Sequence, residues 1–578
     1  MPDKTQIIKL LKDLADMMEF VRENKFKVNA YRFGASAIRG VESDIDELIS
    51  DKKLDQIKGI GKGLQAVIYE FADQGRSSQY EDLRKQVPLG ISDLLKIKGL
   101  GPQKVKQLYT DLAISDLSKL EDAVNNNKLE GLKGFTPTLI KSIPDQINQI
   151  RKNKNYILFN KALEYSDSII SKISPLDSVL KIELTGELRR GMEVFPSLPL
   201  IALIKSEKSF LKELPAELKL THKDNSIIIT GFCEIPVIIT YFDNEPDYIK
   251  GLLVTTGCGG FIKKMFGKKE LSGKNEMEIF NNAKVPFVIP EMREDEFLAV
   301  KDNKLKENSD LTLNEFKGLL HWHTTYSDGR DTLETMLNEA VKLNFQYIAV
   351  CDHSKSAAYA NGLKEDRILL QREQLGKIQQ QYKIKLFQGV ESDILADGSL
   401  DYPQDFLPNF DFVVASIHSR FNLDEKEMTA RIIKAVENPY TDLLGHPSGR
   451  LLLSREPYKM DTEKIIDACI ANKVAIEINA HPKRLDLDWR WIYYARNKGC
   501  LFSINADAHS TSEISYLKYG VMIGRKAGLR NAEVINCFNL ETFIRFLNRK
   551  VKRNSPPLPL TVSSLNALSN SSTEKRKV

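Results

Sequence analysis

The sequence predicts a multidomain protein with an all-α N-terminal region, an α+β middle region and a C-terminal α/β barrel of seven parallel strands. Its 578 residues leave room for about four domains of roughly 150 residues each. The first region has helical periodicity, the second contains strand-like segments, and the third alternates short apolar runs with helical stretches. We expect domains over residues 1–85, 86–150, 151–312 and 316–552, and a disordered tail over 553–578.

Two strand-like segments in the middle region are Ser226–Thr230 and Pro236–Thr240. Both are rich in Ile and Val, which suits a half-buried sheet. The region ends in a charged stretch from Lys301 to Asp310, which we interpret as a linker before the barrel.

Composition and charge exclude several classes of protein. Hydrophobic residues make up 42% and charged residues 28% of the chain, which excludes fibrous and mostly disordered proteins. The 83 Lys and Arg exceed the 78 Asp and Glu by only five, so net charge neither favours nor excludes a nucleic-acid partner. There is no long apolar run, no signal peptide and no Cys-x-x-Cys among the six cysteines. We therefore expect a cytoplasmic protein with reduced thiols and no membrane partner.

Two short motifs in the N-terminal region share one pattern, Ile57-Lys-Gly-Ile-Gly-Lys62 and Ile97-Lys-Gly-Leu-Gly-Pro102. In this helix-hairpin-helix pattern the glycines permit a tight turn and expose backbone N–H groups to a phosphate. Such contacts ignore base identity, so we expect non-specific DNA binding; plain helix-loop-helix turns are the alternative. Leu132-Lys-Gly-Phe-Thr136 resembles a degraded third copy. The residues expected at the phosphates are Gly59, Gly61, Lys62, Gly99 and Gly101.

Seven apolar runs in the third region predict the strands of the barrel. The stretches between them are long enough for crossover helices, which predicts parallel pairing and closure into a barrel. In such barrels the chemistry lies at the carboxyl ends of the strands. Six of the seven runs lead into a His or a Glu. The residues at the ends of the runs are His321, His353, Glu391, His418, His446, Ala480 and His509.

The same strand ends gather metal-binding side chains, including six of the eight histidines. His321 and His323 are two apart in an extended segment, so both face one side, and Asp507 and His509 repeat that spacing. Imidazoles with carboxylates at this density suit zinc, manganese or iron better than magnesium. A single histidine could equally be a hydrogen-bonded core residue, but six aligned ones predict a metal cluster. The expected ligands are His321, His323, Asp328, His353, Glu391, His418, His446, Asp507 and His509.

These residues resemble the successive motifs of the PHP (polymerase and histidinol phosphatase) family. The motifs are Leu320-His-Trp-His323, Cys351-Asp-His-Ser354, Gly389-Val-Glu391, Ser416-Ile-His-Ser419, Gly445-His-Pro447 and Asn505-Ala-Asp-Ala-His509. The resemblance implies a distorted (β/α)7 barrel that holds three divalent metals, Zn²⁺ or Mn²⁺. The three implied ligand groups are His321, His323 and Asp507; Glu391 (bridging), His418 and His446; and Asp328, His353 and His509.

What the resemblance implies chemically is hydrolysis of a phosphoester, with Glu391, Asp507 and His323 as catalytic residues. A water shared by two divalent cations loses its proton near neutral pH and becomes the nucleophile. Three basic residues just beyond strand ends are candidates for binding phosphate, although exposed charges without a role are an equally good interpretation. They are Lys355, Arg450 and Arg484. His481 stands outside the ligand pattern, and we expect a substrate-side or structural role for it.

The middle region carries a second resemblance, to the palm of family X DNA polymerases. Thr185-Gly-Glu-Leu-Arg-Arg190, followed by Glu193, is similar to the motif that opens this palm. It implies a nucleotidyltransferase-like palm and thumb, preceded by a fingers-like helical domain over residues 86–150. Thr256-Gly-Cys-Gly-Gly260 keeps only the Thr-Gly of the family's later nucleotide-binding motif.

The positions that hold magnesium in those polymerases have lost their carboxylates here. In the family, an Asp-x-Asp pair and a third Asp hold two catalytic magnesium ions. Ser197 and Pro199 stand at the pair, Ile238 aligns with the third, and Glu187 replaces a phosphate-binding serine. Proline and isoleucine offer no ligand, so we expect polymerase activity to be lost.

The two resemblances cover nearly the whole chain apart from the tail. They imply a metal-dependent 3′→5′ exonuclease, extending to abasic-site and 3′-end processing, whose polymerase half holds DNA. We expect it to act in DNA repair at the nucleoid, on gapped, nicked or 3′-ended DNA, as a monomer without an obligate protein partner. The alternatives are an active repair polymerase with displaced ligands, a small-molecule phosphatase of the histidinol phosphatase type, and a non-catalytic DNA-binding scaffold.

Overall fold

The computed structural model of the chain describes residues 4–39, 41, 45–88, 90–216, 218–296 and 308–550. The expected tail and most of the expected linker lie outside these residues. The chain divides into two compact units, Met1–Lys154 and Asn155–Val578. Among the described helices, none is both long and apolar enough to cross a membrane.

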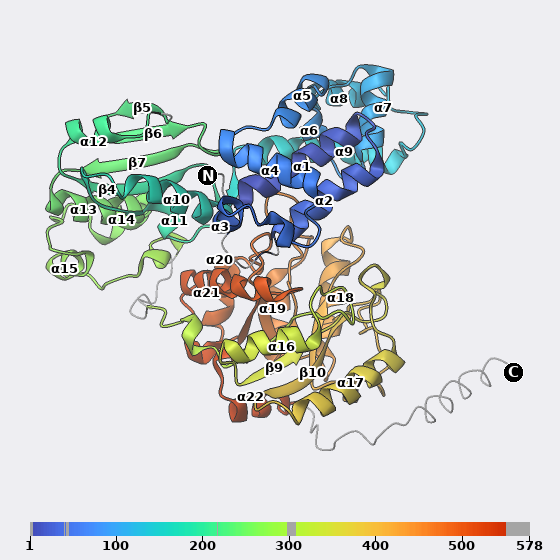
Figure 1. Cartoon of the computed structure of the whole chain (residues 1–578). Coiled ribbons are helices and arrows are strands. Elements are labelled where there is room, and N and C mark those ends of the chain that lie inside the picture. Colours follow the sequence, from blue (N-terminus) through green and yellow to red (C-terminus); the bar gives the residue numbers. More distant parts are fainter. Residues whose placement is uncertain are drawn as a thin grey trace, which may run out of the picture. The chain divides into compact units, whose positions relative to one another are not determined.

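The first unit is all-α, as predicted (blue to cyan in Figure 1). Helix α1 (Lys4–Phe20) packs against α2 (Lys25–Arg39), and apolar residues three or four positions apart on α1, such as Leu11, Leu14 and Met18, are fully buried. The remaining helices are α3 (Ile45–Ser50), α4 (Lys62–Gln74), α5 (Ser78–Gln86), α6 (Ile91–Leu94), α7 (Pro102–Leu112), α8 (Leu117–Asn125) and α9 (Pro137–Asn153).

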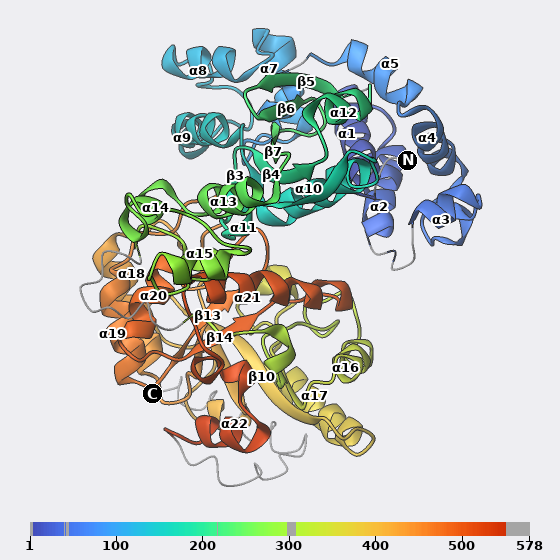
Figure 2. The ribbon, with the colours of Figure 1, turned by 90° about the vertical axis from the view of Figure 1, so that its left-hand side faces the viewer.

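The second unit begins with an α+β region around a five-stranded sheet of order β2-β4-β7-β6-β5. Strands β4 and β7 are parallel, and the other neighbours are antiparallel. Both strands predicted from the sequence are confirmed, as β6 and β7. Helices α10 and α13 cover one face of the sheet (Figure 2). The strands are β1 (Ile157–Leu158), β2 (Val179–Leu184), β3 (Val194–Phe195), β4 (Leu198–Ile204), β5 (Lys219–Lys223), β6 (Ser226–Thr230) and β7 (Val237–Phe242). The helices are α10 (Phe159–Ile173), α11 (Gly186–Arg189), α12 (Glu207–Glu213), α13 (Glu245–Thr256), α14 (Gly259–Met265) and α15 (Glu276–Asn282).

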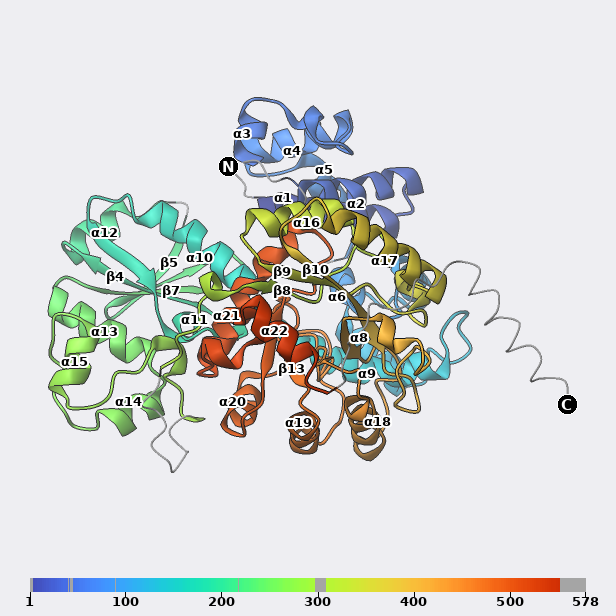
Figure 3. The ribbon, with the colours of Figure 1, turned by 90° about the horizontal axis from the view of Figure 1, so that it is seen from below.

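The rest of the second unit is the predicted barrel. Seven strands pair in parallel in sequence order, and helices surround them (Figure 3). Beyond the ends of the first and last strands, Trp322 and Ala508 form a parallel bridge that nearly closes the barrel. The strands are β8 (Gly318–Leu319), β9 (Tyr347–Val350), β10 (Lys385–Asp393), β11 (Phe412–Ser416), β12 (Leu443–Leu444), β13 (Ala475–Asn479) and β14 (Phe502–Asn505). The helices are α16 (Leu333–Lys342), α17 (Glu365–Gln379), α18 (Glu425–Glu437), α19 (Thr462–Ala471), α20 (Trp489–Asn497), α21 (Leu517–Lys526) and α22 (Leu540–Leu547).

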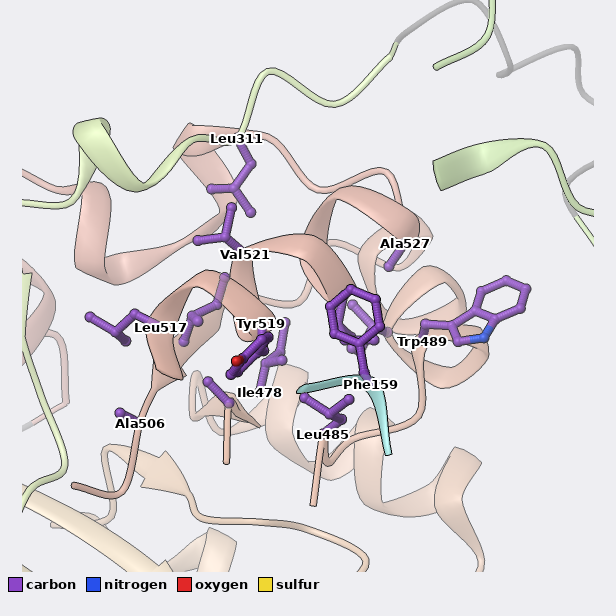
Figure 4. Close-up of a cluster of buried hydrophobic side chains, with 14 of the residues drawn as sticks. Phe159, Leu311, Ile478, Leu485, Trp489, Ala506, Leu517, Tyr519, Val521 and Ala527 are labelled. Carbon is purple, nitrogen blue, oxygen red and sulfur yellow. The ribbon is translucent and has the colours of Figure 1, made fainter. Parts of the chain in front are cut away.

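The α+β region and the barrel share one hydrophobic core. Phe159, the first residue of α10, lies among the barrel residues Leu485, Trp489 and Tyr519 (Figure 4). All four side chains are less than a tenth exposed, and the rings of Phe159 and Tyr519 meet edge to face at 5.8 Å. Because these contacts join residues far apart in sequence, the two regions fold as parts of one body.

Two buried ion pairs cross the same boundary. Arg450 of the barrel donates to Glu193 at 2.9 Å, and Lys526, which is fully buried on α21, donates to Glu294 at 2.6 Å. Glu294 also accepts from Arg190 at 2.8 Å. Removing one partner from a buried pair of this kind costs about 3–5 kcal/mol.

Candidate metal centre

All nine expected ligands converge at the carboxyl ends of the barrel strands. Glu391 lies within β10, and the six histidines and Asp507 follow the ends of β8, β9, β11, β12 and β14. Asp328 reaches the site from the exposed loop after β8. His321 and Asp507 have positive φ angles of 49° and 52°, so the chain turns sharply where it leaves the strands.

Glu391 is the centre of this arrangement and is 1% exposed. Its Oε1 lies 2.9 Å from His446 Nε2, 3.2 Å from His418 Nε2 and 3.3 Å from His321 Nε2. Its Oε2 lies 3.0 Å from His353 Nδ1. One carboxylate therefore faces imidazoles from four different strand ends, as expected of a bridging ligand.

Two further groups flank Glu391. Asp507 Oδ1 lies 3.0 Å from His323 Nε2 and 3.7 Å from His321 Nε2. Asp328 Oδ1 lies 3.3 Å from His509 Nε2 and 3.6 Å from His353 Nε2. Around these atoms, three sets of side chains are each close enough to hold one ion. The sets are His321, His323 and Asp507; His323, Asp328, His353 and His509; and His353, Glu391 and His418.

The chemistry of the donor atoms fits metal ions. Within the described part of the chain, His321 Nε2, Glu391 Oε2 and His446 Nδ1 are buried without a hydrogen-bond partner. Buried polar atoms are rarely left unpaired unless water or an ion satisfies them. Nitrogen and oxygen donors at this density suit divalent transition metals. The ligands expected from the sequence therefore stand where such ions would bind.

Burial and neighbouring charges set the pKa values of these groups in the metal-free chain. Burial and the adjacent His509 and His353 lower the pKa of His323 to about 3, which leaves it neutral. Burial alone would lower the pKa of His418, but Glu391 and Asp393 raise it to about 10. Burial alone would lower the pKa of His509 as well, but Asp328 and Asp507 raise it to about 9.

The two buried acids keep their negative charge. Burial would raise the pKa of Glu391, yet His418 and His321 hold it well below its usual range. Burial would also raise the pKa of Asp507, but His321 and, to a smaller extent, His323 hold it well below its usual range. Both acids are therefore ionised and ready to bind cations at neutral pH.

A second layer of polar residues orients the ligands, and the sequence interpretation missed it. Glu477, on β13 and fully buried, accepts from His321 Nδ1 at 2.5 Å and from the backbone N–H of His446 at 2.7 Å. Asp393 lies 2.6 Å from His418 Nδ1. An acidic residue inside an otherwise apolar strand was the available signal for Glu477, since such a residue needs a buried partner.

The three candidate phosphate-binding residues have different surroundings. Arg484 lies 3.9 Å from Asp507, and its buried Nη1 has no hydrogen-bond partner among the described residues. Lys355 pairs with Glu365 at 2.6 Å. Arg450 is buried and pairs with Glu193, so it joins the two regions of the second unit and does not face solvent as expected. Of the three, Arg484 is the one with a buried donor that no described residue pairs, whereas Lys355 and Arg450 are each held in an ion pair.

His481 is held by residues outside the expected ligand set. Its Nδ1 accepts from the backbone N–H of Lys483 at 3.1 Å, and its ring packs edge to face on Tyr516 at 5.3 Å. Burial lowers the pKa of His481. These contacts fit the structural role that was one of its two expected roles.

The degenerate palm positions lie side by side in the sheet. Pro199 on β4 is the register partner of Ile238 on β7, and both are half-buried on the same face. Ser197 directly precedes β4, and Glu187 lies half-buried on α11, whose first residue, Gly186, packs on Pro199. The three aligned positions therefore come together, with a single hydroxyl among their side chains.

The helix-hairpin-helix turns repeat one backbone geometry. Gly59 and Gly99 have φ angles of 100° and 92°, whereas Gly61 and Gly101 are extended and precede the first residues of α4 and α7. A Cβ added to Gly61 or Gly101 would meet nothing within 4 Å. Folding thus requires the first glycine of each turn, and the second leaves an open helix N-terminus. Lys62 beside it is exposed.

The degraded third copy has the same shape. Gly134 has a φ of 85°, Phe135 is buried, and Thr136 caps α9 by accepting from the N–H of Leu139 at 3.3 Å. The threonine side chain occupies the helix N-terminus that glycine leaves open in the other two turns.

Comparison with known proteins gives two family matches, "Helix-hairpin-helix domain" over residues 2–77 and "PHP domain" over residues 320–481. The chain is 31% identical over 582 residues to "DNA polymerase/3'-5' exonuclease PolX" of Bacillus subtilis (strain 168), covering 94% of this chain and 99% of that protein. Shorter relatives include a "Probable phosphatase" of Acetivibrio thermocellus, 27% identical over 40% of this chain and 95% of that protein. Another "Probable phosphatase", of Caldicellulosiruptor bescii, is 28% identical over 39% of this chain and 93% of that protein.

Proposed function

Because the chain belongs to the family X DNA polymerases that carry a PHP domain, we propose that it is a metal-dependent 3′→5′ exonuclease that has lost nucleotidyl transfer. The observation that carries the proposal is the contrast between its two sites. Eight candidate metal ligands form three groups in the barrel and a ninth, His446, contacts Glu391, whereas Pro199 and Ile238 lie side by side where the palm would need carboxylates. It would act in DNA repair, where it would remove 3′-terminal nucleotides and process damaged 3′ ends and abasic sites.

The barrel residues would hold up to three Zn²⁺ or Mn²⁺ ions, in the groups built around Asp507, Glu391 and Asp328. Bound there, divalent cations would acidify a water molecule and neutralise charge on the phosphoryl oxygens. Glu391 is buried and ionised, so it supplies a fixed negative charge between the groups. His323, neutral because of its low pKa, offers a free lone pair without first losing a proton.

The reaction itself is hydrolysis of the last phosphodiester. Water adds its oxygen to phosphorus, the bond from phosphorus to the 3′ oxygen breaks, and a proton passes to that oxygen. The products are a 5′-nucleotide and a new 3′ hydroxyl. Arg484, with its unpartnered Nη1, is placed to donate to a phosphoryl oxygen and hold the diester in position.

The first unit would bind the DNA substrate. The N-termini of α4 and α7 are open at Gly61 and Gly101, so backbone N–H groups can approach a phosphate closely. Contacts of this kind favour no base sequence. The substrate would therefore be gapped, nicked or 3′-ended DNA of any sequence, bound by a single chain.

The test is an assay on one labelled primer–template scored for shortening and for lengthening, with Mn²⁺ or Mg²⁺ and all four nucleotides. We expect shortening only. Lengthening by the wild type that persists in Asp507→Asn would contradict the loss of polymerase activity. Ser197→Asp with Pro199→Asp should not restore extension, because Ile238 still supplies no third ligand; if it did, Asp243 would be the next residue to test.

A small-molecule phosphatase is the second candidate, favoured by the shorter relatives named as phosphatases. Those proteins match about two fifths of this chain. The remaining length includes the helix-hairpin-helix turns, which a small substrate does not require. Comparing kcat/KM for an oligonucleotide and for histidinol phosphate decides between them, and a higher value for histidinol phosphate would favour the phosphatase.

A further inference from the structure

An aromatic side chain stands uncovered beside the metal centre. Tyr359 is 71% exposed and lies on a short 3₁₀ turn, η6 (Ala358–Ala360), in the loop after β9. Its ring centroid is 6.2 Å from that of His353 and 6.4 Å from that of His418. Among the described residues its phenol has no hydrogen-bond partner. Its position beside two candidate ligands places this exposed ring in reach of a molecule bound at the centre.

The loop that carries Tyr359 is firmly anchored. Ala357 and Ala360, on either side of it, are buried. The N–H of Leu363 donates to the carbonyl of His353 at 2.8 Å, which ties the end of the loop back to a ligand. Gly362 directly precedes Leu363. A Cβ at this position would lie 1.9 Å from the carbonyl oxygen of Ser354, so only glycine allows this close approach.

The loop and one ligand also share an anchor. Ser356 Oγ donates to Asp393 at 3.1 Å, and the other oxygen of Asp393 meets His418 Nδ1 at 2.6 Å. The loop that carries Tyr359 is therefore anchored by the same carboxylate that orients His418. A loop ordered before binding loses little entropy when its side chains contact a ligand.

We propose that Tyr359 is a stacking platform for a nucleobase that flanks the scissile phosphate, an inference that rests on the proposed nuclease function. A phosphodiester bound at the centre brings its adjacent bases within one sugar of the phosphorus atom. Stacking on an aromatic ring is strong and tolerates any base, because every base has a π-face. A simple phosphate ester without a planar ring would gain nothing from Tyr359.

The charge of the ring suits this role. The ordinary pKa of a tyrosine phenol is about 10, so the Tyr359 ring is neutral near pH 7. A phenolate here would repel the phosphate backbone. The neutral ring contributes area for stacking without that repulsion.

The kinetic test compares the wild-type full chain with Tyr359→Phe and Tyr359→Ala on single-stranded DNA. We expect the Phe variant to stay within about twofold of wild type, and the Ala variant to lose about 5- to 150-fold in kcat/KM, mainly through KM. Two further substrates lack the base of the terminal or of the penultimate nucleotide. On the one that lacks the base stacked on Tyr359, the wild type and Tyr359→Ala should have the same kcat/KM. Bound metal must equal that of wild type, and Ile544→Ala, an exposed apolar residue on α22, is the matched control.

A binding experiment separates this inference from the nuclease proposal. The Mn²⁺-loaded full chain is titrated with dAMP and with deoxyribose 5-phosphate, which lacks the base. We expect dAMP to bind more tightly to wild type and to Tyr359→Phe, and the difference to vanish in Tyr359→Ala. Equal binding of both ligands to wild type, an unchanged Ala variant, or a Phe variant as weak as Ala would each overturn the stacking role. If the chain degrades no DNA but prefers dAMP through Tyr359, the nuclease proposal fails and the stacking site stands.

Discussion

Replacing Glu477 with glutamine should weaken metal binding without removing any metal ligand. The carboxylate is fully buried, and each oxygen accepts from two donors. Oε1 accepts from His321 Nδ1 and, at 2.9 Å, from Asn505 Nδ2, whereas Oε2 accepts from the backbone N–H of His446 and, at 3.4 Å, from Asn479 Nδ2. The proton on Nδ1 leaves the lone pair of His321 on Nε2, facing Glu391 and Asp507. Glu477 thus selects the form of His321 that can bind a metal.

The size of the effect follows from these contacts. Glutamine keeps one oxygen and turns an NH₂ group toward the two donors that faced the other, so charge-assisted hydrogen bonds are lost at a cost of about 1.5–3 kcal/mol each. If the NH₂ group faces His321, the ring must accept on Nδ1 and carry its proton on Nε2, where the metal should be. Orienting residues of this kind are typically worth about 10- to 100-fold in metal affinity.

The assay is competition for Zn²⁺ or Mn²⁺ between the full chain and a chromophoric chelator. We expect the dissociation constant of at least one ion to rise about 10- to 100-fold in Glu477→Gln, with the saturating number of ions unchanged. Asp442→Asn is the matched control, because Asp442 is a buried barrel carboxylate that pairs with Arg549 at 3.0 Å and touches no ligand. Unchanged affinity in Glu477→Gln, or an equal loss in the control, would refute the orienting role.

Three further predictions concern the same sites. Loading the metal-free chain with metal at about pH 7.5 should release on the order of three protons, because the raised pKa values of His321, His418 and His509 keep these residues protonated until a metal binds. Metal affinity should therefore fall as the pH drops. Calorimetry in two buffers of different ionisation enthalpy measures the number of protons released. Asp507→Asn should lower exonuclease activity by orders of magnitude at an unchanged melting temperature, and full activity would assign cleavage to another site. The double variant Gly61→Val with Gly101→Val should reduce DNA affinity at least about tenfold and weaken its salt dependence. The control is Gly376→Ala on α17, where an added Cβ would also meet nothing within 4 Å, and it should leave DNA affinity unchanged. Filter-binding or anisotropy assays measure both.

The barrel and the convergence of its candidate ligands were predictable because the information is local. Six of the seven apolar runs lead into a candidate ligand at their own ends, so identifying His353 or Glu391 requires only the strand and its direction. Pro199 and Ile238 were identified through the resemblance to the polymerase palm and not through spacing, and the fold shows that they are register partners on parallel strands.

What the sequence did not reveal depends on partners distant along the chain. Arg450 follows a strand end like a phosphate-binding arginine, and only the fold shows that it meets Glu193, 257 residues away. Tyr359 is one aromatic residue in a loop until the fold sets it beside His353 and His418. A residue's immediate neighbours in sequence are the same whether its side chain faces solvent, a ligand or another domain.

The shared core at Phe159 has a consequence for how such a protein can change over time. A palm that has lost its magnesium ligands would ordinarily be free to accumulate changes and then to disappear. Here Phe159 fills a space lined by Trp489 and Tyr519, and Glu193 neutralises a buried arginine of the barrel. Deleting the palm would uncover that apolar surface and remove Glu193, one of the two carboxylates that pair with the buried Arg450; Asp488 is the other. The selection that keeps the barrel folded therefore also keeps the palm, whether or not the palm catalyses a reaction of its own.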